Sequence, residues 1–221
     1  MQTCSRLPAP VTSPGEFDVR VCGPHAARAD IEAYIARRYQ RSHGARIDAF
    51  MPLLLAAAHR GGYAAALGLR PAGSEPLFLE QYLDTPIETA VAAGLQQPIE
   101  RTRVVEVGNL AASYRSGGQL LIVLLIEALR GAGFRWLVCT ATRQVRAVVQ
   151  SLGLPLHALA AADPARLGEA RTAWGRYYEA EPLVMAGDLA VGLAHIRADA
   201  RLLALTEAHA PALARLTQAL R

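Results

Sequence analysis

The chain has 221 residues, carries a formal charge of +4 and is 52% hydrophobic. This length supports one substantial hydrophobic core and leaves little room for a second full domain. No stretch reaches the roughly 18 to 20 apolar residues that a membrane-spanning helix needs, and the N-terminus lacks the pattern of a secretory signal. We therefore expect a cytoplasmic protein without a transmembrane segment.

Charge and cysteine usage argue against two further classes of function. The sequence contains no lysine, and its arginines are scattered with no basic run, which disfavours nucleic-acid binding. The three cysteines, Cys4, Cys22 and Cys139, match neither a zinc site nor a disulfide framework, so we expect reduced thiols. The histidines lack acidic partners at a motif spacing, and we expect no metal site.

The first part of the chain predicts an arm, a helix and three strands. Residues 1–16 are rich in proline and are expected to form a flexible arm. Phe17–Val21 alternates apolar and polar residues as a half-buried strand does, and helical spacing predicts a helix over Ala26–Tyr39. Ala49–Leu55 and Tyr63–Leu69 are apolar segments separated by two glycines, so they predict a pair of strands joined by a turn.

The following segment predicts one more strand and a short helix. Leu77–Leu83 is apolar enough for a strand, or for a strand that runs into a turn. Ile87–Leu95 is a helix candidate, with Asp84 or Thr85 as its N-cap and Pro86 in its first position.

The centre of the chain gives the best-defined unit. Arg103–Val107 alternates β-branched residues and predicts a strand, and Gly108-Asn109 directly after it suits a bulge or a splay. A loop ends at Gly117-Gly118, and the almost wholly apolar residues Gln119–Gly131 predict a buried helix. Phe134–Ala141 returns as a strand, and the βαβ order makes the two strands parallel.

The last third of the chain alternates helices and strands. Its expected elements are a helix over Arg143–Leu152 ended by Gly153, a strand over Leu154–Leu159, a short helix from Asp163 to about Ala173, a strand over Leu183–Ala186, and a helix from about Ala190 to Arg221 broken at Pro211. We divide the chain into the arm 1–16, an α/β domain over 17–190 and a C-terminal helical extension over 191–221.

A candidate anion site lies between the central strand and its helix. Arg115-Ser116-Gly117-Gly118 precedes a helix N-terminus, where free backbone N–H groups and the helix dipole face an anion. This placement favours a diphosphate or a phosphopantetheine arm. The alternative is a tight turn before a buried helix, because glycine pairs end many loops.

Five short motifs stand in order along the chain. They are Leu77–Leu83, the run Val105-Glu106-Val107-Gly108-Asn109-Leu110-Ala111, Cys139–Thr142, Leu152-Gly153-Leu154, and Trp174-Gly175-Arg176-Tyr177-Tyr178. Together they resemble the thermostable hemolysin family of bacteria over about residues 20–190. That family is grouped with the GCN5-related N-acetyltransferase fold, and the Glu106 strand is also similar to one in acyl-homoserine lactone synthases. The resemblance implies an α/β (α+β) fold, with a mixed central sheet flanked by helices, splayed central strands and a C-terminal helical segment.

The resemblance also implies where an acyl donor binds. Arg115 and Gly118 fit the pyrophosphate loop of the acetyltransferase fold, whereas Leu120 departs from its final Gly or Ala, which leaves acyl-CoA and acyl carrier protein both open as donors. The implied donor contacts are Leu110, Ala111, Ala112, Arg115, Ser116, Gly117, Gly118 and Gln119, and the implied substrate contacts are Asn109, Thr140, Trp174 and Tyr177.

Glu106 is the first candidate for a general base. Its alternation with Val105 and Val107 places it on one face of a central strand, where partial burial raises the pKa of a carboxyl toward a useful value. The alternative is an edge carboxylate that pairs with Arg101 or Arg103. The catalytic role rests on the resemblance more than on the pattern.

Glu80 and Tyr178 are further catalytic candidates. Glu80 would bind the substrate amine or share the role of base, and its alternative is an ion-paired strand residue. Tyr178, in a short aromatic cluster, would protonate the leaving sulfur, although such clusters more often serve as packing anchors.

The leading hypothesis is an N-acyltransferase that moves an acyl group from acyl-CoA or acyl carrier protein to a small amine such as an amino acid. The thioester is a co-substrate, and no permanently bound cofactor is expected. One alternative is a membrane-active hemolysin, although no cationic amphipathic helix of large moment supports it. Another is a non-catalytic protein that binds an acyl carrier. Acyl length, acceptor and oligomeric state stay open.

Overall fold

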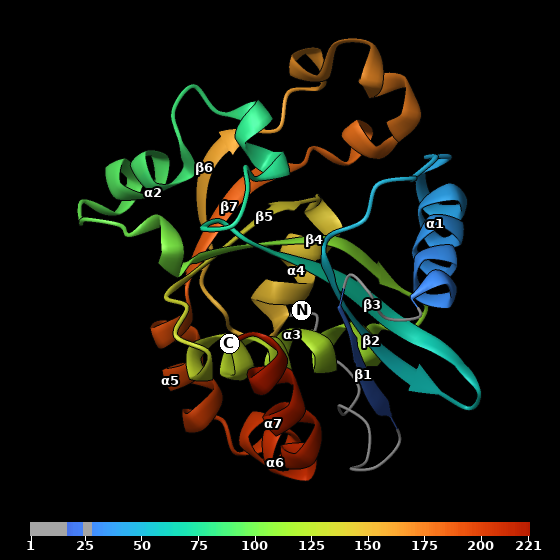
Figure 1. The fold of residues 1–221 in the computed structure, drawn as a ribbon, viewed down its shortest axis with the longest axis vertical. Helices are drawn as coiled ribbons and strands as arrows, with labels where there is room; N and C mark the ends of the chain where they lie inside the picture. The colour runs from blue at the N-terminus through green and yellow to red at the C-terminus, as the bar shows by residue number, and fades with distance from the viewer. Residues whose placement is uncertain (1–16, 24–27) are drawn as a thin grey trace, which may run out of the picture.

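The computed structural model describes residues 17–23 and 28–221, so the predicted arm over 1–16 lies outside the described residues. In the part of the chain that the structure describes, one mixed sheet of seven strands, in the order β1-β2-β3-β4-β5-β7-β6, runs through the molecule with helices on both faces (Figure 1). This architecture confirms the predicted fold class of a mixed central sheet flanked by helices.

The N-terminal half supplies three antiparallel strands and one helix. They are β1 (Asp18–Cys22), α1 (Ala29–His43), β2 (Leu53–His59) and β3 (Gly62–Pro71). The predicted pair of strands is confirmed, but β2 begins later than expected. Arg28 donates to the carbonyls of Met51 and Pro52, and Asn109 accepts from the Met51 N–H, so this stretch is anchored by side chains before the strand begins.

The predicted strand over Leu77–Leu83 is wrong, because Phe78–Tyr82 forms a 3₁₀ helix, η1. Its first N–H groups are satisfied by carboxylates instead of a sheet neighbour: Phe78 and Leu79 donate to Glu106, and Leu77 donates to Glu80. The next helix, α2 (Ile87–Leu95), has the predicted bounds.

The N-cap predicted for α2 is also corrected. Pro86 occupies the N-cap position instead of Asp84 or Thr85, and it is not the first helical residue. The N–H of Ile87 donates to the Glu80 carboxylate, which therefore satisfies one of the free N–H groups at the start of α2, as a capping side chain would. A single turn, η2 (Arg101–Arg103), then leads into the central strand.

The predicted βαβ unit is confirmed, with β4 (Val104–Ala112), α3 (Arg115–Gly131) and β5 (Trp136–Ala141), and β4 pairs with β5 in parallel. The helix begins earlier than expected. Arg115–Gly118, predicted as a loop, is therefore the first turn of α3.

The bulge and the splay predicted at Gly108-Asn109 are confirmed. Asn109 has a φ of 51°, and the β3–β4 register shifts between Ala66 and Gly68. Pairing of β4 with β5 ends at Val107, while β4 continues away to Ala112 (Figure 1). Gly108 has a packing reason as well, because a Cβ there would lie 2.4 Å from the Met51 side chain.

The elements after β5 complete the sheet beyond β5, where β7 pairs with β5 and β6 pairs with β7. They are α4 (Arg143–Ser151), β6 (His157–Ala161), η3 (Pro164–Trp174), η4 (Tyr177–Ala180) and β7 (Leu183–Asp188). The predicted strand over Leu154–Leu159 starts only at His157, and the short helix after Asp163 is 3₁₀ with a kink at Gly168.

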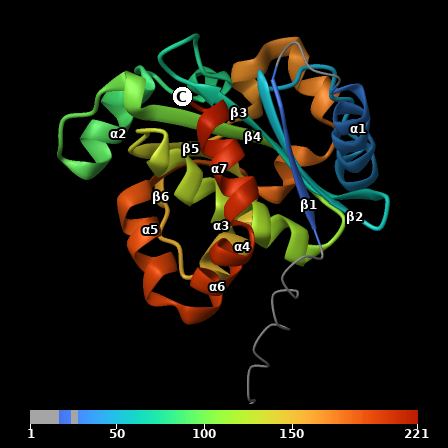
Figure 2. The same cartoon turned by 60° about the horizontal axis from the view of Figure 1, so that its bottom comes forward.

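Three helices, α5 (Leu189–Ala198), α6 (Ala200–Ala208) and α7 (Ala210–Ala219), follow β7 and pack around α3 (Figure 2). Ile196, Leu202 and Leu216 share one hydrophobic cluster with α3. The breaks fall at Asp199 and His209, not at Pro211, because Asp199 caps α6 and Pro211 lies in the first turn of α7.

The sheet therefore has two differently covered faces. Helix α3 and its neighbours α4 to α7 cover one face, while α1, η1, α2 and η3 pack on the other (Figures 1 and 2). No helix of the described residues has both the length and the apolar character to cross a membrane.

Candidate active site

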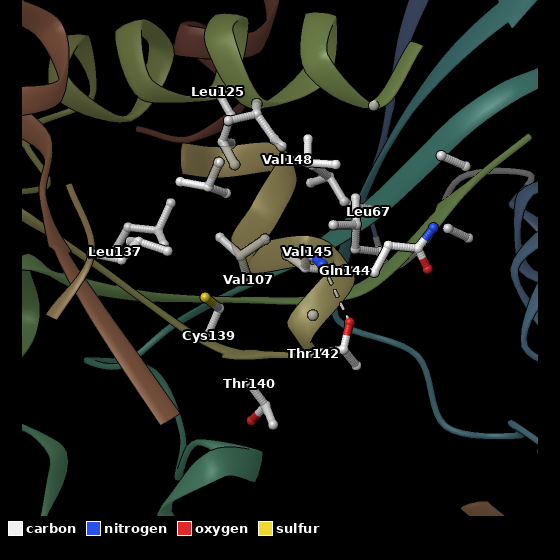
Figure 3. A pocket seen from close by; sticks show the side chains of 18 of the residues that line it. Leu67, Val107, Leu125, Leu137, Cys139, Thr140, Thr142, Gln144, Val145 and Val148 are labelled. Atoms are coloured by element: carbon white, nitrogen blue, oxygen red, sulfur yellow. Dashed lines mark hydrogen bonds between the residues drawn. The ribbon is translucent and has the colours of Figure 1, made fainter. Parts of the chain in front are cut away.

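A cavity of about 480 Å³ opens where β4 and β5 diverge, bounded by α3 on one side and α4 on another (Figure 3). Side chains from four elements converge on it: Leu125 from α3, Val145 and Val148 from α4, Val107 from β4, and Leu137 from β5. The walls contributed by these helices and strands are mainly apolar.

The two ends of the cavity differ in chemistry. Thr140 and Thr142, at the C-terminal end of β5, line it together with Arg38 and His43 from α1. The opposite end is lined by Leu137 of β5 and by Gly187 of β7, which pairs with Leu137. From there the cavity continues to residues of α5. The cavity therefore runs along β5 from a polar end to an apolar end.

The polar end carries cationic and titratable groups. The Nε atom of Arg38 is buried, and no hydrogen-bond partner is found for it among the described residues. Burial, and secondarily the charge of Arg176, lowers the pKa of His43. Arg115, in the first turn of α3, also lines the cavity. A negatively charged group entering this end would meet arginine on two elements.

Glu106 lies in the middle of the sheet, on the face of β4 opposite to Val105 and Val107, and unlike Val107 it is not among the residues that line the cavity. Its side chain is buried, with a relative exposure of 2%, and its two oxygens accept from the N–H groups of Phe78 (2.8 Å) and Leu79 (3.0 Å). Burial raises its pKa to about 7, although these two hydrogen bonds act in the opposite direction. The carboxyl is therefore poised to exchange a proton near neutral pH.

The ion pair considered as an alternative for Glu106 is not what the structure contains. Arg101 is engaged by Glu80 and Glu88, and Arg103 approaches Glu100. The nearest cationic influence on Glu106 is Arg70, its cross-strand partner in β3.

Glu80 is surrounded by hydrogen-bond donors. It forms an ion pair, as the alternative to a catalytic role predicted. It receives two hydrogen bonds from the Arg101 guanidinium and further bonds from the N–H groups of Leu77 and Ile87. The Arg101 hydrogen bonds are the main reason that its pKa falls to about 2. Glu80 thus ties η1, α2 and η2 together, and it is not among the residues that line the cavity.

An aromatic cluster of Tyr82, Trp174, Tyr177 and Tyr178 lies next to the polar end of the cavity; Tyr177 lines the cavity, whereas Tyr178 is not among its lining residues. The hydroxyls of Tyr82 and Tyr178 lie 2.6 Å apart, and Tyr177 donates to the Thr140 carbonyl (3.3 Å). Trp174 packs edge-to-face or tilted against both Tyr177 and Tyr178. Burial raises the pKa of Tyr178, so its phenol stays protonated at neutral pH.

The predicted contact residues divide into two groups. Those that line the cavity are Leu110, Ala111, Ala112, Arg115, Gly118, Thr140 and Tyr177. Of the others, Asn109 bonds Met51, Gly117 packs against Ala64, and Gln119 is buried beside Ser151. Ser116 lines a second hollow next to Tyr114, and Trp174 belongs to the aromatic cluster.

Several cavity residues were not anticipated from the sequence. Val145, Val148 and Val149 follow helical spacing, which indicates an apolar face of α4 but not what that face contacts. Cys139, expected from the sequence to be a reduced thiol, also lines the cavity. Its sulfur points into the cavity in Figure 3, and burial raises its pKa to about 12, which keeps it protonated.

Comparisons with known proteins agree with this fold. A family model described as thermostable hemolysin matches residues 22–193. Among solved structures, FeeM, an N-acyl amino acid synthase from uncultured soil microbes, is 11% identical with a TM-score of 0.56 and coverage of 81% of this chain and 94% of its own. MesI, a CoA-dependent acyl-homoserine lactone synthase, is 17% identical with a TM-score of 0.51. The alignment covers 86% of this chain and 93% of that one.

BjaI, another CoA-dependent acyl-homoserine lactone synthase, solved with SAM and isopentyl-CoA, is 12% identical with a TM-score of 0.53. The alignment covers 91% of this chain and 99% of that one. No curated protein matches the chain by sequence. At these identities, the structural likeness establishes the fold that the chain shares with these proteins.

Proposed function

The chain belongs to the thermostable hemolysin family, and we propose that it is an N-acyltransferase that moves an acyl group from a thioester to the amine of a small molecule such as an amino acid. The observation that carries this proposal is the cavity at the divergence of β4 and β5, with a polar and an apolar end. Glu106, which precedes the cavity-lining Val107 in β4 but is not itself a lining residue, supplies a carboxyl with a pKa of about 7.

The proposed donor enters along the free edge of β4. Among the described residues, pairing of β4 with β5 is found only up to Val107, and Leu110–Ala112 line the cavity beyond it. Unpaired backbone groups on a strand edge bind the amides of an extended ligand, and phosphopantetheine carries such amides. This arm is common to acyl-CoA and acyl carrier protein.

The N-terminus of α3 supports an anionic donor. Tyr114 makes no side-chain cap, the first turn contains no acidic residue, and Arg115 and Gly118 both line the cavity. Such a helix end favours phosphate oxygens. Leu120, the departure from the related motif, is fully buried in the hydrophobic core, so its side chain is not an obstacle in the cavity.

In the proposed reaction the amine nitrogen attacks the thioester carbonyl carbon, the C–N bond forms, and the C–S bond breaks without an acyl-enzyme. Glu106 takes the proton that the amine loses, directly or through water, because each of its oxygens keeps a lone pair beyond the backbone bond it accepts. The departing thiolate takes a proton from the Tyr82–Tyr178 pair or from water.

The acceptor is proposed to bind at the polar end. Arg38, with its unpartnered Nε, suits a carboxylate, so an amine that also carries a carboxylate fits this end best. FeeM, by its name, makes N-acyl amino acids, and BjaI was solved with SAM, which is in keeping with an acceptor of the amino-acid class.

The test is release of free thiol from acyl-CoA and acyl carrier protein thioesters, each offered with amino acids and other small amines. We expect thiol release that depends on the amine and yields the N-acyl product by mass spectrometry. Absence of turnover with every pair, together with lysis of erythrocytes by the pure protein, would replace the enzyme by a membrane-active hemolysin. Binding of an acyl carrier without turnover or lysis would favour the non-catalytic alternative.

A further inference from the structure

The apolar end of the cavity is closed by the junction between β7 and α5. Gly187, at the end of β7, and Gly192, within α5, both line the cavity there. The facing side chains are Ile126 from α3 and Leu154 and Leu156 from the segment between α4 and β6. This end is therefore built from the last part of the chain, which closes over the central helix.

Neither glycine is explained by its backbone. Both have ordinary φ values, outside the left-handed region where glycine is favoured. Within a helix, glycine is less favourable than alanine by about 1 kcal/mol, so Gly192 weakens α5 locally. The reason for glycine at these positions has to come from the space around them.

That space is narrow and belongs to the cavity. A Cβ on Gly192 would lie 3.3 Å from the Ile126 side chain, and one on Gly187 would lie 2.9 Å from the Leu156 side chain. Both neighbours line the cavity themselves, so a larger residue must either displace them or fill the apolar end. A side chain at either position would therefore change the shape of the apolar end.

The size of the cavity indicates what fills it. A cavity of roughly 150 Å³ already accommodates benzene, and this cavity measures about 480 Å³. An acetyl group would leave its apolar end empty, with lining side chains that lose their contacts. An extended hydrocarbon chain would bury that lining along its length.

We propose that the transferred group is a fatty acyl chain and that Gly187 and Gly192 set the longest chain that the cavity accepts. This inference rests on the proposed acyltransferase function, and it assigns the apolar end of the cavity, opposite to the polar end, to chain-length selection. The specificity residues are contributed by β7 and α5, not by the strands that carry the reacting groups.

The activity test compares wild type with Gly192→Leu over saturated thioesters from acetyl to palmitoyl. We expect the preferred chain to become shorter, with kcat/KM falling about fourfold for each methylene that no longer fits, as follows from about 0.8 kcal/mol per buried methylene. Rates with the shortest chains should stay unchanged. The matched control is Ala194→Leu, on the exposed side of the same helix, which should leave the profile unchanged.

Two further variants keep the test decisive if Gly192→Leu does not fold. Leu156→Ala enlarges the same end and should move the preference toward longer chains, and Gly192→Ala should give a smaller shift toward shorter ones. An unchanged chain-length profile in the folded variants, or an equal loss with every chain, would overturn the inference.

Binding separates this inference from the proposed function. Displacement of a fluorescent fatty acid by octanoic and by palmitic acid measures chain preference without turnover. If wild type binds palmitic acid but transfers nothing, the enzyme proposal fails, and a loss of palmitic acid binding in Gly192→Leu still supports the apolar end as a chain-length gauge. If wild type catalyses transfer while the folded Gly192→Leu and Leu156→Ala variants both keep the wild-type chain-length preference, the acyltransferase proposal stands and the role of the apolar end in chain-length selection is wrong.

Discussion

Two carboxylates in neighbouring segments have opposite environments. Glu106 is buried in the sheet, and the donors found for it among the described residues are backbone N–H groups, so burial dominates and raises its pKa to about 7. Glu80 receives the Arg101 guanidinium as well as backbone donors, and its pKa falls to about 2. Hydrogen bonds from an arginine thus keep the Glu80 carboxylate ionised, whereas burial without such bonds leaves Glu106 able to exchange a proton.

The largest expected effect comes from Glu106→Gln, which removes the proposed base and keeps the size of the side chain. We expect turnover to fall by about 10²- to 10⁴-fold, the usual contribution of a general base, while the affinity for the acyl donor changes little. Single-turnover kinetics and donor titration measure the two quantities.

Gly118→Val serves as the opposite control, because it blocks the donor site at the first turn of α3 and should weaken donor binding itself. An equal loss of turnover and donor affinity in Glu106→Gln would count against the role of base.

Stability against pH should show the two carboxylates acting in opposite directions. Between about pH 4.5 and 7 the folded protein holds a proton on Glu106 that the unfolded chain has released, so the free energy of unfolding falls as pH rises, by up to about 3 kcal/mol. Glu80 contributes stability above pH 4.5 that is lost as pH falls toward 2. Urea unfolding across this range measures both.

Glu106→Gln should flatten the fall between pH 4.5 and 7, while Glu80→Gln should leave it in place. A wild-type stability that rises through that window would show that the Glu106 pKa is not raised.

Glu80→Gln should act on the fold more than on the chemistry. It weakens the charged hydrogen bonds to Arg101, and we expect a loss of about 2 kcal/mol in the free energy of unfolding at neutral pH. Turnover per folded molecule should stay within a few-fold of wild type. A loss of turnover as large as that of Glu106→Gln, without loss of stability, would return Glu80 to the catalytic group.

The smallest expected effect is that of Tyr178→Phe. It removes one hydroxyl of the 2.6 Å pair with Tyr82 and should lower turnover about tenfold or less, since water can also protonate the leaving thiolate. Tyr82→Phe is the matched control, because it keeps the Tyr178 hydroxyl. Identical rates in wild type and Tyr178→Phe would leave Tyr178 as a packing residue of the aromatic cluster.

Local patterns were sufficient for the βαβ unit and for the bulge at Asn109, because alternation, a long apolar helix and the Gly108-Asn109 pair each act within a few residues. The strand predicted over Leu77–Leu83 was wrong because of a residue that is distant in the sequence. Glu106, far along the chain, takes the N–H groups of Phe78 and Leu79 and favours a 3₁₀ turn over a strand.

The resemblance pointed to β4 and to the start of α3, where Leu110, Arg115 and Gly118 line the cavity. The remaining walls of the cavity were not predictable, because they depend on register and packing. Gly187 reaches the cavity only through its pairing with Leu137, and Val145 and Val148 reach it only through the placement of α4 over the divergent strands. A single sequence contains no signal for such contacts.

The most direct test of the account is kcat/KM against pH for wild type and for Glu106→Gln, with one acyl thioester and an excess of one amino acid. The account predicts an acidic limb in wild type with a midpoint at about 7, where Glu106 loses its proton, and no such limb in Glu106→Gln. Profiles of the same height and shape in both proteins would contradict it, because the buried carboxyl would then have no part in the reaction.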